Sequence, residues 1–202
     1  MTVTSGERPL DALEMGRGER TRALILEASR QLFLERGYAG TPITAITEAC
    51  GISRAGFYTY FKDKHDVFNT LGETAYHDQL AVIERLETQP RPYQLADVRR
   101  WVGEYFAYMD RHGAFVLSAY SSAPDDAAFR RSRNRMVTRS AWRLGQAIGG
   151  NGTHSPEVLG AAATGLLDRA WHAVQSQWVA LDPQEMIAVV AEMIFAMIGQ
   201  RE

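Results

Sequence analysis

The residues of this 202-residue chain that are best suited to chemistry lie in a short polar segment. It places a guanidinium, a hydroxyl, two phenols and two ammonium groups close together, at Arg54, Tyr58, Thr59, Tyr60, Lys62 and Lys64. These groups donate hydrogen bonds or carry positive charge, and no nucleophile stands beside a base among them. Proteins contact the phosphates and base edges of DNA with groups of this kind. The segment is therefore expected to bind nucleic acid rather than to catalyse a reaction.

Two short helices joined by a tight turn are expected to position these groups, within the stretch TPITAITEACGISRAGFYTYF. Pro42 suits the first position of a helix capped by Thr41, because a proline there loses no hydrogen bond. Gly51 is placed to end this helix, since glycine takes the left-handed conformation at little cost. Ser53 is a good N-cap for a second helix, Arg54 to Tyr60. This order predicts a helix-turn-helix, whose second helix enters the DNA major groove.

The helix-turn-helix defines the side chains expected to contact double-stranded DNA. Tyr58, Tyr60, Thr41 and Lys64 are expected to meet mainly phosphate, whereas Arg54 and Thr59 are expected to meet base edges. The complete predicted interface is Thr41, Thr44, Arg54, Gly56, Tyr58, Thr59, Tyr60, Lys62 and Lys64.

The same stretch resembles the DNA-binding domain of TetR-type transcriptional regulators. That family has a Gly-Tyr pair near the end of its first helix, a threonine before the second, and then I-A-x-x-A-G-V-S-x-G-x-L-Y-x-Y-F and a lysine. The matching residues are Gly37, Tyr38, Thr41, Ile46, Gly51, Ile52, Ser53, Phe57, Tyr58, Tyr60, Phe61 and Lys64. Two positions depart from the pattern: Cys50 stands where alanine is usual, and Ala55 where glycine is common.

The sequence motif SRxxFYxYF is similar to that of the branch of the ethionamide-resistance repressor, whose regulatory domain holds apolar ligands. Only the first third of the chain carries the resemblance. It implies a repressor that binds a palindromic operator as a homodimer and is released by a small hydrophobic effector.

Composition agrees with a locally confined DNA contact. The formal net charge is −2, with nine basic against eight acidic residues up to Lys64 and 13 against 16 beyond it. A chain of this balance does not attract nucleic acid over its whole surface. The single cysteine, Cys50, excludes an intramolecular disulfide and fits a reducing, cytoplasmic compartment. It is expected to be a small buried hydrophobe. No membrane partner is expected, because the longest apolar run, Met186 to Ile198, is too short to span a bilayer.

Hydrophobic spacing predicts an all-α fold of about nine helices. Residues 1–17 are expected to form a flexible arm, residues 18–64 the helix-turn-helix domain, and residues 65–202 a helical domain for ligand binding and dimerisation. A long helix over residues 64–87 is expected to join the two domains. The next helix starts near Leu95 and is expected to end at His112-Gly113. The helices expected after it are a short one to about residue 121, then 125–148, 156–180 and 183–200.

Large aromatic side chains gather on the helices of the second domain. Such stripes are usually ordinary core, but many rings on few helices can also leave an apolar pocket with polar tips. The residues expected to line such a pocket are Trp101, Tyr105, Met109, Phe115, Tyr120, Met136, Trp142 and Trp171. Asp168, Arg169 and His172 could add polar contacts or lie on the surface.

The last two helices predict a dimer. Small residues let another helix approach closely, and the final helix is apolar almost all round, so that one subunit alone would not cover it. The predicted contacts are Gly165, Ile187, Val190, Ile194 and Met197. The alternative is a helix buried wholly within one subunit.

Two further features bear on function. Six arginines, at positions 130, 131, 133, 135, 139 and 143, indicate either a solvated face or an anion-binding row, for instance for the phosphates of an acyl-CoA. Catalytic, metal-ligand and cofactor motifs are not seen, so the protein is expected not to be an enzyme and to use no cofactor. A small helical enzyme and a constitutive architectural DNA binder remain as alternatives. An enzyme would show polar residues meeting in its deepest cavity, and an architectural protein would lack a cavity.

Overall fold

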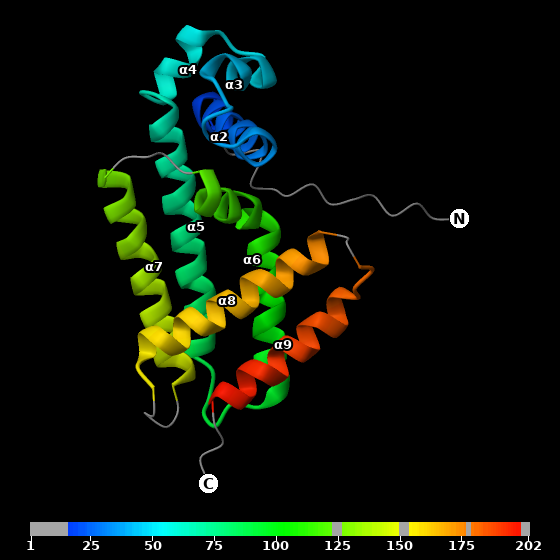
Figure 1. Ribbon diagram of the computed structural model, residues 1–202. Coiled ribbons are helices and arrows are strands. Elements are labelled where there is room, and N and C mark those ends of the chain that lie inside the picture. Colours follow the sequence, from blue (N-terminus) through cyan, green and yellow to red (C-terminus); the bar gives the residue numbers. More distant parts are fainter. Residues whose placement is uncertain (1–15, 123–126, 150–153, 177–178, 199–202) are drawn as a thin grey trace.

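The computed structural model describes residues 16–122, 127–149, 154–176 and 179–198, and all regular secondary structure in these residues is helical. The predicted all-α fold is confirmed (Figure 1). Residues 1–15, which make up most of the predicted arm, lie outside the described part of the chain. The helices are α2 (Arg17–Arg36), α3 (Ile43–Cys50), α4 (Arg54–Tyr60), α5 (Lys64–Glu87), α6 (Leu95–Ser122), α7 (Ala127–Ile148), α8 (Pro156–Gln175) and α9 (Pro183–Ile198).

Helices α2, α3 and α4 form a small unit at one end of the molecule, above the larger bundle of α6 to α9 (Figure 1). The predicted turn is confirmed: Gly51 ends α3 with φ 63°, and the Ser53 side chain caps α4 by accepting a hydrogen bond from the Gly56 amide. Phe57 fixes α4 to the unit, because its ring is fully buried against the core that α2 and α3 share. Cys50 is buried as predicted, with its sulfur 3.6 Å from the Leu24 carbonyl oxygen.

Thr41 differs from its predicted role. Pro42, not Thr41, is the N-cap of α3, and the Thr41 side chain makes no cap hydrogen bond. Thr41 is fully buried, and its hydroxyl lies within hydrogen-bonding distance of the carbonyl oxygens of Leu32 (3.1 Å) and Gly37 (2.8 Å). Both carbonyls lie near the C-terminal end of α2, Leu32 in its last turns and Gly37 at its C-cap. Thr41 therefore ties α3 to α2 and is not available to contact DNA phosphate.

The long helix α5 belongs to both cores. Asp63 caps it, accepting a hydrogen bond from the Asp66 amide at 2.8 Å. Phe68 and Leu71 pack in the core of the amino-terminal unit, whereas Val82 and Leu86 pack in the core of the second bundle. The domain boundary predicted after residue 64 therefore falls at the start of a helix that both units share.

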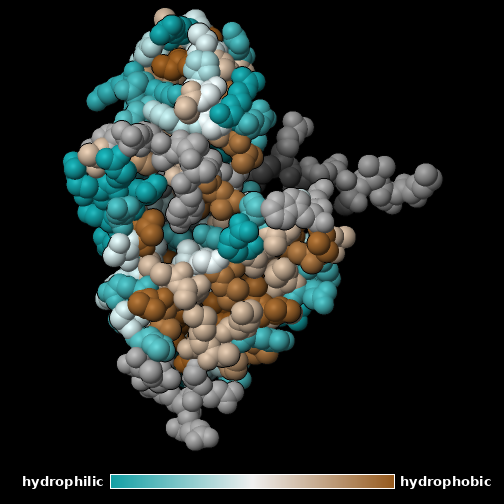
Figure 2. Space-filling view, viewed as in Figure 1, coloured by the Kyte–Doolittle hydropathy of each residue, from teal (hydrophilic) through white to brown (hydrophobic). Residues whose placement is uncertain are grey.

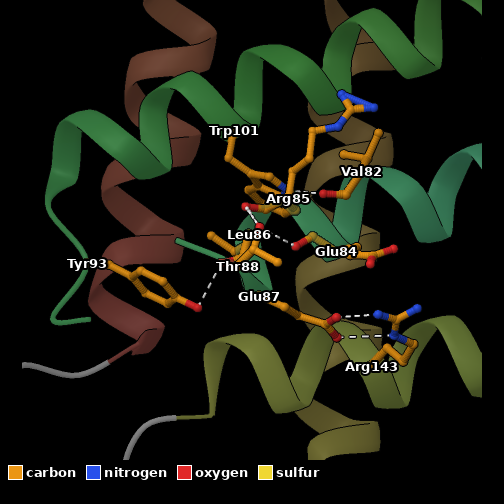
Figure 3. Close-up of polar contacts among 9 residues, drawn as sticks. All are labelled: Val82, Glu84, Arg85, Leu86, Glu87, Thr88, Tyr93, Trp101 and Arg143. Atoms are coloured by element: carbon orange, nitrogen blue, oxygen red, sulfur yellow. Dashed lines mark hydrogen bonds and ion pairs between the residues drawn. The ribbon is translucent and has the colours of Figure 1, made fainter. Parts of the chain in front are cut away.

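The C-terminal end of α5 is held by three other segments (Figure 3). The Trp101 indole donates to the Val82 carbonyl at 2.8 Å, and the Tyr93 hydroxyl donates to the Leu86 carbonyl at 3.0 Å. Arg143 of α7 pairs with Glu87 through two parallel hydrogen bonds. Charge-assisted bidentate pairs of this kind have a defined geometry. This end of α5 is consequently fixed to the second bundle.

The helix break predicted at His112-Gly113 is wrong, because α6 runs without interruption to Ser122. A Cβ on Gly113 would lie only 2.5 Å from the ring of Trp171, so this glycine serves the close approach of α8 rather than a turn. His112 has a partner on another helix. It is buried, and its Nε2 lies 2.7 Å from a carboxylate oxygen of Asp78 on α5.

Helices α7 and α8 pack backbone to backbone. A Cβ on Gly160 would lie 1.7 Å from the Ala141 carbonyl oxygen, and one on Gly145 would lie equally close to that of Pro156. Such contacts require glycine on each helix. The predicted start of α7 at residue 125 lies outside the described residues, whereas α8 ends at Gln175, five residues before the predicted end. The close packing of α7 and α8 sets the width of the space between them and α5.

Candidate functional site

The exposed face of α4 presents the residues predicted to read DNA. Arg54, Tyr58 and Thr59 are all exposed. The Arg54 guanidinium lies 5.8 Å from the centre of the Tyr58 ring and donates a hydrogen bond to the Tyr58 hydroxyl at 3.3 Å. This contact holds a cation and a phenol side by side on the solvent side of the helix. The arrangement suits simultaneous contact with a base edge and a neighbouring phosphate.

The remaining predicted DNA contacts divide into two groups. Thr44 and Lys62 are exposed, whereas Gly56 and Tyr60 are half-buried. Lys64 is half-buried as well: its ammonium lies 4.1 Å from the centre of the Tyr38 ring and donates to the Tyr38 carbonyl. Burial lowers the pKa of Lys64. Lys64 thus joins the start of α5 to the turn that follows α2, a packing role that the sequence pattern did not show.

A cavity of about 610 Å³ lies between α5, α6, α7 and α8. Its wall is largely apolar and includes Gly72 and Ala75 of α5, Phe115 of α6, and Met136 and Val137 of α7. Cavities of this size and character hold small organic molecules. In the part of the chain that the structure describes, no group of three or more metal-ligating side chains is placed to hold a metal ion.

Asp168 of α8 is the buried acidic residue of this wall. It is only 7% exposed, and its Oδ1 accepts a hydrogen bond from the Tyr105 hydroxyl at 2.9 Å. Gln79 donates in turn to the Tyr105 hydroxyl at 3.4 Å. Burial raises the pKa of Asp168 to about 6, although the hydrogen bond from Tyr105 opposes this rise. Burial also raises the pKa of Tyr105, so the phenol stays a donor.

Ser140 of α7 is a second polar residue of the cavity wall. The side chain is 3% exposed, and its hydroxyl has no hydrogen-bond partner among the described residues. A buried hydroxyl without a partner costs free energy, and a bound molecule with a polar atom nearby would remove that cost.

The amino-terminal unit matches a known protein family. Residues 25–71 match the family model described as bacterial regulatory proteins, tetR family. The match begins in α2 and ends inside α5, so it covers the whole helix-turn-helix. Residues 25–71 are therefore similar to the amino-terminal domain of TetR-family regulators.

Individual relatives agree with this assignment. The HTH-type transcriptional regulator TtgR of Pseudomonas putida is 33% identical over 76 residues, which cover 37% of this chain and 36% of TtgR. The chain thus matches about a third of the length of that relative. The relatives are regulators of transcription, in agreement with the prediction that the protein is not an enzyme.

Solved structures extend the likeness of fold to the second bundle. A putative fatty acid metabolism regulator of Clostridium perfringens superposes with a TM-score of 0.69 at 18% identity, covering 88% of this chain and 100% of that one. NalD of Pseudomonas aeruginosa superposes with a TM-score of 0.65 at 20% identity, covering 88% and 95%. The helical bundle that follows the TetR-type domain is therefore the fold of these regulators.

Only some of the residues predicted to line a pocket lie in the wall of the cavity. Phe115 and Met136 do line the cavity, and Tyr108, Phe129 and the α5 face join them. Tyr105 reaches it only through its bond to Asp168. Trp101 and Met109 are buried in the core of the bundle outside the cavity wall, and Trp171 packs on Gly113 and donates to Asp110. Trp142 is 45% exposed, and the side chain of Tyr120 lies outside the described residues.

The cavity wall on α5 was missed because those positions read as ordinary inward-facing core. Periodicity shows which face of a helix points inward, but not whether that face meets side chains or a void. The burial of Asp168 could have been suspected from its place among apolar residues of α8. Its partner Tyr105 lies 63 positions earlier and is brought to it only by the fold.

The predicted arginine row is divided between different roles. Arg143 pairs with Glu87, and Arg133 lines the cavity while donating to the Ala119 carbonyl at 3.2 Å. Arg131, Arg135 and Arg139 are exposed, and hydrophilic side chains gather over α7 in the space-filling view (Figure 2). Arg131, Arg135, Arg139 and Arg143, which are four positions apart in the sequence, therefore do not form a single row with one role.

The predicted dimer contacts on α9 need correction. Ile187, Val190 and Ile194 are buried within the chain itself, where they pack in the core of the second bundle. Gly165 is exposed and Met197 is half-buried. The outward face of α9 instead carries Val189 and Met193, which are 47% and 49% exposed. Apolar residues cover α8 and α9 over much of this side of the molecule (Figure 2).

Proposed function

We propose that the protein is a ligand-responsive transcriptional repressor, acting in the cytoplasm. It binds a palindromic DNA operator as a homodimer and releases it when a hydrophobic small molecule occupies the cavity. One observation carries this proposal: α5 forms a wall of the cavity and follows α4 after only three residues, Phe61 to Asp63. A ligand that binds in the cavity therefore acts on α5, the helix that directly follows the DNA-reading helix α4.

The anchoring of one end of α5 determines which part of this helix a bound ligand can displace. Its C-terminal end is fixed by Trp101, Tyr93 and Arg143 (Figure 3), while Gly72 and Ala75 face the cavity nearer its N-terminal end. A ligand that fills the cavity and displaces the N-terminal half of α5 would shift α4 with it. The ligand must bind the displaced arrangement more tightly, because equal affinity for both arrangements shifts nothing.

The exposed apolar face of α8 and α9 supports a dimer. A contiguous apolar surface of this kind usually marks a protein interface. A two-fold pairing would present two copies of α4 to two half-sites, which requires a symmetric operator and a fixed separation of the helices. A change in that separation spoils the fit to successive major grooves. The exposed residues Val158, Val189 and Met193 are the proposed contacts, together with Gly165.

The similar proteins support a repressor. NalD is described as the secondary repressor of a multidrug efflux pump, and AcnR of Corynebacterium efficiens, 34% identical over 71 residues, is named a transcriptional repressor. The mostly apolar wall of the cavity, as far as the structure describes it, argues against the alternative of an enzyme. The presence of a cavity also argues against a purely architectural DNA binder.

Selection of bound sites from a random DNA library tests the proposal. We expect the selected DNA site to be palindromic. We also expect apolar compounds that bind the protein to release the protein from this site. The variant Gly72→Leu places bulk in the cavity from α5, where a Cβ would lie 3.8 Å from the Phe115 ring. It should weaken ligand binding at least about tenfold. Gly103→Leu is the matched control, because Gly103 lies outside this cavity with open space around it. Equal ligand affinity in both variants would place the ligand elsewhere.

A further inference from the structure

We propose that the cavity selects ligands that carry a protonated amine on an apolar body, with the Asp168 carboxylate as the partner of the ammonium group. The inference rests on the proposed function of the cavity as the effector site and adds the chemical class of the effector. It follows from the surroundings of one buried carboxylate and from the distribution of the other charges around the cavity.

The Asp168 carboxylate is buried without a cation. Among the described residues, its one hydrogen bond is the one that Oδ1 accepts from Tyr105, and no ion pair involves Asp168. A buried charge is stable only when it is paired or well supplied with hydrogen bonds. One neutral donor satisfies only part of a carboxylate, which has about four acceptor positions. The side chain lines the cavity, so a ligand can supply what the protein does not.

The other charged residues of the cavity wall are less buried than Asp168. Glu73 and Arg169 are exposed, and Arg133 is half-buried with its guanidinium donating to the Ala119 carbonyl. Charges in contact with water are screened, whereas a charge in an apolar interior acts at full strength over several ångströms. Asp168 therefore sets the sign of the electrostatic potential in the inner part of the cavity. That sign is negative at neutral pH and favours a cation.

The apolar wall defines the rest of the ligand. Phe115, Phe129, Met136 and Val137 surround a space of about 610 Å³, large enough for a molecule of drug size. Burial of an apolar body supplies most of the affinity, while the charge pair selects among bodies of the same size. The predicted class is thus a lipophilic amine, and an alcohol or acid of the same chain length should bind less well.

A series of decyl compounds tests this selection, each used below its micellar concentration. Decylamine, decyltrimethylammonium, decanol and decanoate share one apolar chain and differ in the charge and hydrogen-bonding capacity of the head group. Displacement of the neutral fluorescent probe N-phenyl-1-naphthylamine reports occupancy for all four. We expect the two cations to displace the probe at concentrations at least about tenfold lower than decanol, with decanoate weakest.

Two variants assign this preference to its residue. In Asp168→Asn, which keeps the shape but removes the charge, the cations should lose their advantage to within about threefold of decanol. In Glu73→Gln, which removes an exposed carboxylate of the same wall, the full preference should remain. Asp168→Leu, similar in size and apolar, gives the same comparison if the Asn variant is unstable.

The outcomes separate the two proposals. A preference for decanoate, equal displacement by all four compounds, or an amine preference that survives in Asp168→Asn would overturn the amine inference while leaving the cavity as a ligand site. Failure of the probe and of every decyl compound to bind would contradict both the inference and the proposed effector site. Tighter binding of decylamine than of decyltrimethylammonium would support the inference and show that the ammonium protons also donate hydrogen bonds to Asp168.

Discussion

At the scale of single residues, Asp168 combines a cost for stability with a proposed use in binding. Its folded-state pKa of about 6 lies above the ordinary value of 3.8, because burial disfavours the charged form. An acid with a raised pKa destabilises the folded state at pH values above that pKa. As the pH falls from about 6 towards 3.8, the folded protein takes up the proton first and the penalty disappears.

The raised pKa of Asp168 predicts how the stability of the Asp168→Asn variant compares with that of the wild type in the absence of ligand. The variant should be more stable than the wild type at pH 8, by up to about 3 kcal/mol on a scale of about 1.4 kcal/mol for each pKa unit. The difference should shrink as the pH is lowered to 5. Urea denaturation at the two pH values measures it. A variant that is less stable than the wild type at pH 8 would mean that the carboxylate is supported better than its contacts indicate.

Arg54 and Lys62 are expected to contribute differently to DNA binding. Arg54→Ala should reduce discrimination between operator and altered sites by roughly 1–3 kcal/mol, because guanidinium contacts to base edges carry sequence information. Lys62→Ala should weaken binding to all sequences alike and reduce the salt slope by about one, as expected for loss of one phosphate contact. Fluorescence anisotropy over a range of salt concentrations tests both. Equal losses on operator and random DNA in both variants would show that α4 does not read bases.

Sequence and structure agree at residues whose roles are local, and differ where the partner is distant in the chain. Gly51 and Ser53 were predicted correctly, because a turn and a cap involve only neighbouring residues. Thr41 and Lys64 were expected to contact phosphate, and the fold also gives each a partner within the chain. Thr41 bonds the Gly37 carbonyl at the end of α2, and Lys64 bonds the Tyr38 carbonyl in the turn beyond it. A polar side chain in a short motif has the same pattern whether it faces DNA or a helix end.

At the scale of helices, α6 shows how a glycine can mislead. Gly113 was expected to end a helix, but the close contact with Trp171 explains it better. The indole of Trp171 is held in place, because it is buried and donates to Asp110 at 2.8 Å. A glycine that admits a ring from another helix cannot be told from a helix-ending glycine by its neighbours in the chain.

Alanine substitutions in α6 distinguish the two roles of glycine. Gly113→Ala should destabilise the protein by roughly 1–3 kcal/mol, because the added methyl group displaces the Trp171 ring. Gly103→Ala, in the same helix but with open space around it, should instead stabilise by up to about 1 kcal/mol through helix propensity alone. Urea denaturation compares the pair. If both substitutions stabilise, α8 does not approach α6 as closely as described.

At the scale of the whole molecule, the fold class and the order of helices followed from the sequence, whereas the surfaces did not. Helical spacing shows that α9 is apolar on several sides, but it does not show which side the chain covers itself. Packing against α6 takes Ile187, Val190 and Ile194 and leaves Val189 and Met193 outside. The proposed dimer contact therefore moves to the opposite face of the same helix.

Met193→Glu tests this face. The added carboxylate would be buried in the proposed interface without a partner, which should yield monomers and weaken operator binding. Leu95→Glu is the control, since Leu95 is also an exposed apolar residue but lies at the start of α6. Light scattering coupled to size-exclusion chromatography gives the mass of each variant. A dimeric Met193→Glu protein would exclude this part of α9 from the interface.

The central claim is that occupancy of the cavity is coupled to DNA binding through α5. The most direct measurement uses the decyl compound that displaces N-phenyl-1-naphthylamine at the lowest concentration. The dissociation constant of the operator is measured with and without saturating compound, and that of the compound with and without saturating operator. Coupling is reciprocal, so both constants should rise by the same factor, at least about tenfold. A compound that displaces the probe yet leaves the operator dissociation constant unchanged would contradict the claim.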